Sequence, residues 1–336
     1  MTIRKEELIS CMLNTELGAV LAVVRRPTDP AVAQFEQDSA DPTLIQSLKS
    51  LRPLIYKHRQ EWHSIDPSIY LSPFLDVIQH DDVPAAATAV ALSAVLKILN
   101  QQIFDENTPG AREAINTLVL NGVPSCKLEK TYPAVEDNVI MRILQVLESI
   151  IKHPASIHLS DEAVCNLVNA CFQVMQQSSN RGDLIQHSAW YTMNEIIQVI
   201  FTRLPKVEGK SITSMNAAGI KDETPYGISC MLDIFHSFCS LLNVAEMVEH
   251  DGLFYQTSKE DVQQFTLEMI NSIIELSGDA IASHPQLLRL VQDDLFQHLI
   301  LYGTRSRPLN LAIICSIVLN LYKSLRKLEN RPSSSR

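Results

Sequence analysis

The amino-acid sequence predicts an all-α fold, an irregular armadillo/HEAT-like α-solenoid of about twelve helices. Three observations predict it. Apolar residues recur with helical spacing, prolines fall where helices should begin or end, and no window shows a sustained period of two. Hydrophobic residues make up 46% of the chain, which suits a large packed core and excludes a mostly disordered polypeptide.

The helical spacing is clearest in EDNVIMRILQVLESIIKH and SDEAVCNLVNACFQVM, where apolar residues follow the i, i+3, i+4, i+7, i+11 rule. Asp66-Pro67 and Thr108-Pro109 each place a capping oxygen before a proline at the first expected helical position. No strict repeat period is visible, which disfavours ankyrin and tetratricopeptide repeats. The expected helices cover residues 4–26, 42–61, 67–80, 84–102, 109–121, 134–153, 161–178, 182–204, 226–244, 259–279, 284–302 and 308–328.

The N-terminal stretch LNTELGAVLAVVRRPTDP contains a short apolar run, Leu17 to Val24. A signal peptide has a positive start and no acids, whereas here Glu16 precedes the run and Arg25 follows it. The run rises about 12 Å as a helix, against the ~30 Å core of a bilayer. We therefore expect a core helix.

The charge and the cysteines limit the classes of partner and compartment. A formal net charge of -10 argues against broad binding to nucleic acids or acidic membranes. The 7 cysteines are odd in number and lie mostly in apolar helical surroundings, without a secretory signal. We expect reduced core thiols in a cytoplasmic protein and no nucleic-acid partner.

A change in composition divides the chain. Residues 205–224, PKVEGKSITSMNAAGIKDET, lack a helical face and carry two Gly together with several Ser, Thr and Asn. We expect a linker here, between an N-terminal block, 1–204, and a C-terminal block, 225–336.

No constellation of catalytic residues is visible. The sequence has no G-x-G-x-x-G, no G-x-x-x-x-G-K-[ST], no G-x-S-x-G, no C-x-x-C and no H-E-x-x-H. Cys165 and Cys171 are six residues apart, which does not align two ligands on one helix face. Trp62 and Tyr70 are expected to pack rather than to stack on a ligand. We expect no catalytic residue, no cofactor and no metal.

Five segments carry a resemblance to a known family: LNTELGAVLAVVRR, IDPSIYLSPFLDVIQ, ALSAVLKIL, NVIMRILQVL and PYGISCMLDIFHSFCSLLNVAE. In this order they resemble the N-terminal regulatory region of the large Golgi-type Arf guanine-nucleotide exchange factors, the Gea/GNOM group. The resemblance implies that residues 1–204 are a dimerisation and cyclophilin-binding (DCB) domain. It also implies that residues 225–336 begin the HUS domain, the homology region upstream of the catalytic domain.

Two departures from the family pattern bear on activity. The HUS box, N-[YF]-D-C-D, is absent, so we expect the HUS-like region to be truncated. The exchange domain with its F-R-L-P-G-E glutamate finger is also absent, because FTRLPK places Lys206 where the motif needs Gly. The resemblance therefore implies a chain without exchange activity.

By this resemblance, the function is a non-catalytic regulatory and dimerisation module acting in Golgi vesicle trafficking. Its implied partners are a second copy through the N-terminal block, the HUS and exchange domains of the longer protein, cyclophilin or small GTPases, and the Golgi membrane as a peripheral site. Two alternatives stay open: a free-standing helical-repeat adaptor without exchange activity in any longer form, and an enzyme whose site the sequence does not reveal.

Two charged residues are candidates for the interface. Lys97 interrupts AVALSAVLKIL, a segment otherwise dominated by small and apolar residues, and Asp137 lies in the opening turns of the helix at 134–153. We expect Lys97 of one copy to meet Asp137 of a second copy across a two-fold axis, and the symmetry makes this contact twice. The alternative is that Lys97 extends to solvent and Asp137 favours the helix N-terminus.

The last expected helix carries an apolar strip beside basic residues. If further HUS helices are missing, the strip is exposed and favours aggregation, self-association or membrane contact; the alternative is that it packs on the preceding helices. The strip consists of Val318, Leu321, Tyr322 and Leu325.

Overall fold

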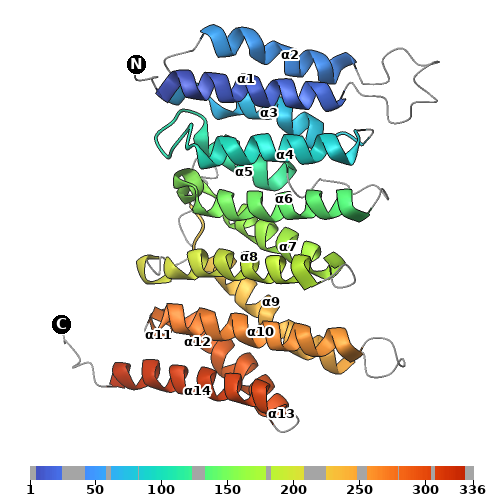
Figure 1. Ribbon diagram of the computed structural model, residues 1–336. Coiled ribbons are helices and arrows are strands. Elements are labelled where there is room, and N and C mark those ends of the chain that lie inside the picture. Colours follow the sequence, from blue (N-terminus) through green and yellow to red (C-terminus); the bar gives the residue numbers. More distant parts are fainter. Residues whose placement is uncertain are drawn as a thin grey trace, which may run out of the picture. The chain divides into compact units, whose positions relative to one another are not determined.

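A computed structural model describes residues 5–24, 42–57, 62–81, 83–122, 133–178, 183–207, 225–247, 256–278, 280–303 and 307–329. All regular secondary structure in these ranges is helical, which confirms the all-α prediction, and within each of two compact units successive helices pack on one another as in a helical repeat (Figure 1). The α-helices are α1 Lys5–Val24, α2 Pro42–Lys57, α3 Pro67–Gln79, α4 Ala85–Asn100, α5 Ala111–Thr117, α6 Pro133–Lys152, α7 Asp161–Ser178, α8 Asp183–Thr202, α9 Ile228–Met247, α10 Gln256–Ser277, α11 Ala280–Ser283, α12 Pro285–Arg289, α13 Phe296–Gly303 and α14 Pro308–Glu329. Shorter 3-10 or π segments are η1 Trp62–Ser64, η2 Leu118–Gly122, η3 Pro154–His158, η4 Leu204–Lys206 and η5 Leu290–Leu295.

The chain forms two compact units, Met1–Thr192 and Met193–Arg336, and α8 spans the division. In the first unit, α4 packs between α1 and α6, and α3 packs on α4 as well (Figure 1). The residues of α4 that face its neighbours are mostly Ala, Leu, Val and Ile and are almost fully buried. Small side chains let the helices approach closely, which explains why this apolar sequence forms the centre of the unit.

In the second unit, α10 packs against α9 and α14. The single helix expected at 284–302 is instead α12, the π-helical segment η5 and α13 in succession. The apolar pattern continues through all three, with Leu287, Val291, Leu295 and Leu299 buried at a spacing of four residues. A π segment advances more residues per turn than an α-helix and keeps this spacing on one face, which periodicity alone does not reveal.

The proline signals have different outcomes. Asp66 caps α3 as predicted, because its carboxylate accepts a hydrogen bond from Ser68 N at 2.8 Å and Pro67 is the first helical residue. The prediction for Thr108-Pro109 is wrong, since α5 begins at Ala111 after Gly110 at φ 77°. Thr108 Oγ1 instead accepts a hydrogen bond from Asp105 N at 3.0 Å, which closes a turn before the helix.

Two aromatic contacts with polar partners lie in the core of the first unit. Trp62 packs edge-on against Tyr70, with ring centroids 5.9 Å apart, and donates from Nε1 to Ser10 Oγ at 3.2 Å. This confirms that the two aromatic residues pack. His153 lies against Phe104, and its Nδ1 accepts a hydrogen bond from Ala155 N. Burial lowers the pKa of His153 to about 4, an effect that the charge of Asp105 opposes.

Most residues of the expected linker, 208–224, and Cys126 lie outside the described ranges, so the division at 205–224 stays a prediction. Cys171, Cys230 and Cys239 are buried, as expected for core thiols, and burial raises the pKa of Cys171 and Cys239 to about 12. The expectation is wrong for Cys11 and Cys315, which are exposed because each lies on the outward side of its helix.

Candidate interaction sites

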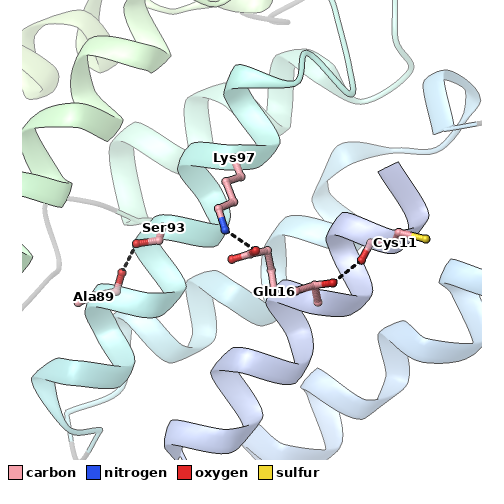
Figure 2. Close-up of polar contacts among 6 residues, drawn as sticks. Cys11, Glu16, Ala89, Ser93 and Lys97 are labelled. Carbon is pink, nitrogen blue, oxygen red and sulfur yellow. Dashed lines mark hydrogen bonds and ion pairs between the residues drawn. The ribbon is translucent and has the colours of Figure 1, made fainter. Parts of the chain in front are cut away.

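The first candidate site is an ion pair between α1 and α4. Lys97 Nζ lies 2.5 Å from Glu16 Oε1, and Figure 2 shows the two side chains meeting between the helices. The side chain of Glu16 is only 7% exposed. Its neighbours on α1 are buried as well: Leu13, Leu17 and Val20. The Lys97 side chain is 53% exposed, so its ammonium group meets both the buried carboxylate and solvent.

The structure therefore gives Lys97 a partner within its own chain, which neither interpretation of the sequence included. Asp137 lies half-buried in the opening turns of α6, the helix that packs beside α4, and has polar interactions of its own. An ammonium group has three hydrogen-bond donors, so the contact with Glu16 leaves donors on the exposed side of Lys97 for another acceptor. The dimer contact between Lys97 and Asp137 stays a prediction.

Sequence reasoning missed Glu16 as part of this site. In the sequence, the charge of Glu16 only argues against a signal peptide. The signal that points to the pair is the isolation of both charges: Glu16 is the one charged residue of α1 beyond its first turn, and Lys97 is the one charged residue of α4. Buried charges are normally paired, so two such lone charges on packed helices are expected to meet.

The second candidate site is the outer face of α14. Of the predicted strip, Val318 is 41% exposed, Tyr322 is 60% exposed and Leu325 is half-buried. The prediction is wrong for Leu321, which is 1% exposed because it lies with Ile314 and Ile317 on the face that packs against α10.

Two helices in the described residues are long and apolar enough to cross a membrane by length and composition, α1 and the Pro308–Arg326 part of α14. α1 packs against α2 and α4, and 44% of its apolar window is buried, as in a core helix. Only 22% of the α14 window is buried.

Two open hollows are further concave features of the described residues. One, of about 490 Å³, lies between α4 and α6 and is lined by polar residues including Asn100, Arg142, Gln145 and Lys152. The other, of about 640 Å³, lies in the second unit and includes Ser277 and Lys323. Within the described ranges, no group of three or more His, Cys, Asp or Glu side chains is placed to hold a metal ion.

The sequence is similar to one protein family and to several known proteins. Residues 227–330 match the family described as "Mon2/Sec7/BIG1-like, HUS domain". The chain is 58% identical to ARF guanine-nucleotide exchange factor GNL2 of Arabidopsis thaliana, over 96% of this chain and 24% of that protein. It is 39% identical to ARF guanine-nucleotide exchange factor GNOM of the same plant, over 95% of this chain and 26% of that protein. The Golgi-specific brefeldin A-resistance guanine nucleotide exchange factor 1 homolog of Caenorhabditis elegans is 36% identical over 42% of this chain.

The stacked helices and the HUS match define the class as a helical region of a Sec7-related protein. More particularly, the chain is homologous to a part of the ARF guanine-nucleotide exchange factors GNL2, GNOM and GNL1, as the resemblance predicted. It spans about a quarter of the length of these curated relatives.

Proposed function

We propose that this chain is a non-catalytic regulatory module of an Arf guanine-nucleotide exchange factor of Golgi vesicle trafficking. It acts by self-association through its N-terminal block and by contacts with the HUS and exchange domains of a longer protein or with partner proteins. Cyclophilin, small GTPases and the Golgi membrane are the partners that the family resemblance suggests. The observation that supports the proposal is the identity of 58% across almost the whole chain with only 24% of an exchange factor.

The proposal includes the absence of exchange activity. The stretch FTRLPK, which resembles the glutamate-finger motif, ends α8 and forms η4, in which Leu204 is the first residue and fully buried and Pro205 is the second. Its residues therefore have a structural explanation as a helix end. The test is release of a fluorescent GDP analogue from Arf, in which this chain should leave the spontaneous rate unchanged. Acceleration that depends on the concentration of the chain would contradict the proposal.

Self-association is tested by size-exclusion chromatography with light scattering on designed variants. Lys97→Ala alone is a poor probe, because it leaves the Glu16 carboxylate buried without its cation. We therefore compare the variant Glu16→Gln with the double variant Glu16→Gln/Lys97→Ala, which differ only at Lys97. The variant Asp137→Ala tests the other residue of the proposed contact.

If Lys97 of one copy and Asp137 of the other form a desolvated pair, the double variant and Asp137→Ala should each weaken dimerisation by about 2–5 kcal/mol. If the two charges lie at the rim of the interface, the loss should be less than about 1 kcal/mol. Glu16→Gln should leave the dimer intact, and circular dichroism should show unchanged helix content in all three. Dimers of undiminished affinity in both the double variant and Asp137→Ala would exclude these residues from the interface.

A further inference from the structure

The hollow between α4 and α6 contains a buried hydrogen-bond donor that has no acceptor. His153 lines this hollow and is only 4% exposed, with its ring centroid 4.4 Å from that of Phe104. Its Nδ1 accepts a hydrogen bond from Ala155 N, so the neutral ring carries its proton on Nε2. This Nε2 is buried and has no hydrogen-bond partner among the described residues. Because an unpaired buried N–H is costly, an occupant that offers an acceptor there is favoured.

A cation without a carboxylate partner lines the same hollow. Arg142, half-buried on α6, donates from Nη1 to Gln145 Oε1 at 2.9 Å, and its other guanidinium N–H groups have no acceptor in the described ranges. The remaining charges of the lining cancel, since Lys152 Nζ pairs with Glu148 Oε1 at 2.7 Å. A guanidinium group binds a carboxylate through two parallel hydrogen bonds, so Arg142 favours an acidic group in the hollow.

Side-chain amides line the hollow as well. Asn100 is the last residue of α4, Gln102 follows it closely, and Gln145 lies on α6. Asn100 Oδ1 accepts a hydrogen bond from Ser149 Oγ at 3.1 Å and Gln145 Oε1 accepts from Arg142, which leaves both amide nitrogens to donate elsewhere. An amide side chain offers the same kinds of donor and acceptor as a peptide bond. The lining therefore suits the backbone of a polypeptide.

The positions of Arg142 and His153 set the length of an occupant that meets both. They are 11 positions apart, at α6 and the residue that follows it, which is about 16 Å along the helix axis. An extended chain rises about 3.3 Å per residue, so about five residues cover this distance. The volume of the hollow, about 490 Å³, lies in the range of ligand-binding clefts, and alternate side chains of an extended peptide would point out of it.

The net charge of the chain, -10, repels an acidic peptide at long range. At physiological salt, exposed charges more than about 8 Å apart are largely screened. The groups that line the hollow therefore decide its electrostatics, and among them Arg142 is the cation without a counter-charge in the described ranges.

We propose that the hollow between α4 and α6 binds an extended acidic peptide of about five residues. Arg142 pairs with a carboxylate near one end of the peptide, and His153 Nε2 donates to a backbone carbonyl near the other end. The amides of Asn100 and Gln145 bind the backbone between them. The inference names a surface for the proposed contacts with partner proteins and rests on that part of the proposed function.

The first test presents the chain with pools of end-capped pentapeptides whose only charged residue is a Glu at the first or last position. Matched pools carry Gln in its place. Size-exclusion chromatography separates the bound peptides, and mass spectrometry identifies them. The chain should retain peptides of the Glu pools about tenfold more than their Gln counterparts, because a hydrogen bond to a charged group is stronger than a neutral one.

The second test measures the affinity of a retained Glu peptide, labelled with fluorescein, by fluorescence anisotropy. Arg142→Gln should weaken binding about twentyfold and should bind the Glu and Gln peptides equally, which a purely structural role of Arg142 would not produce. His153→Asn should weaken binding about fivefold, because the Asn oxygen replaces Nδ1 as the acceptor for Ala155 N and the shorter side chain does not reach the position of Nε2. The matched control is Arg52→Gln, at an exposed arginine of α2, which should bind as the wild type does. Circular dichroism should show unchanged helix content in all three variants.

Equal retention of the Glu and Gln pools, or retention of neither, would overturn the proposal. An affinity of Arg142→Gln or His153→Asn equal to that of Arg52→Gln would also overturn it. If the amount of peptide bound per chain falls as the concentration of the chain rises, a second copy occupies the hollow and the proposal is wrong. The GDP-release and light-scattering assays contain no peptide, so failure of the proposed module and failure of this site are distinguishable.

Discussion

Replacing Lys97 with Ala should destabilise the fold more than replacing Glu16 with Gln. The Glu16 side chain is 7% exposed and that of Lys97 is 53% exposed, so the two partners respond differently to loss of the other. Breaking a fully buried pair costs about 3–5 kcal/mol, and partial hydration of this pair reduces the expected cost of Lys97→Ala to about 2 kcal/mol. Glu16→Gln should cost about 0.5–1 kcal/mol, because the amide oxygen still accepts from Lys97 and the ammonium remains hydrated.

Urea unfolding at pH 7.5 measures both free energies, with the m-value as the check that the transition is unchanged. Lys152→Ala is the matched control, since Lys152 pairs with Glu148 at 2.7 Å on the surface of α6. That i, i+4 pair should contribute about 0.5 kcal/mol or less. Lys97→Ala/Glu16→Leu should regain most of the lost stability, because it removes the unpaired buried carboxylate. If Lys97→Ala costs no more than Lys152→Ala, the explanation of the pair by burial of Glu16 is wrong.

Two further predictions concern pH and the backbone. The folded pKa of His153, about 4, lies below that of an unfolded histidine, so the unfolded chain binds the proton first as the pH falls and stability declines from pH ~6.5 towards ~4. Urea unfolding should show a loss of about 2 kcal/mol from this group between pH 7.5 and 5.0, which His153→Asn abolishes; the same loss in the variant would contradict the assignment. Gly110 has φ 77°, and a Cβ there would meet the Asp66 carboxylate at 2.4 Å, whereas Gly18 lies in α1 with open space around it. Thermal unfolding should show that Gly110→Ala lowers stability by about 2 kcal/mol and Gly18→Ala raises it by about 0.5–1, and equal effects would refute this explanation.

The helices were predictable because their signals are local. The expected helix at 134–153 is α6, 133–152, and the expected helix at 161–178 is α7 with the same bounds. In both, a continuous apolar face begins and ends at residues that the sequence marks clearly. The division of 284–302 into α12, η5 and α13 was not predictable, because a π segment keeps an apolar face and differs only in its hydrogen bonds.

The candidate sites were less predictable, because they depend on which helices meet. The sequence singles out Lys97 as unusual, yet its contact with Glu16 joins residues 81 positions apart. Leu321 shows the same limit on α14, where a strip chosen by composition mixes a residue packed on α10 with residues that face outward. Periodicity identifies an apolar helix, and only the packing shows which face is covered.

Sedimentation equilibrium of the wild-type chain over a concentration series, without lipid or partner, tests the proposed self-association module most directly. We expect a reversible dimer whose population rises with protein concentration and falls in the Glu16→Gln/Lys97→Ala variant. A single species at the monomer mass of 37.6 kDa at every concentration would contradict it.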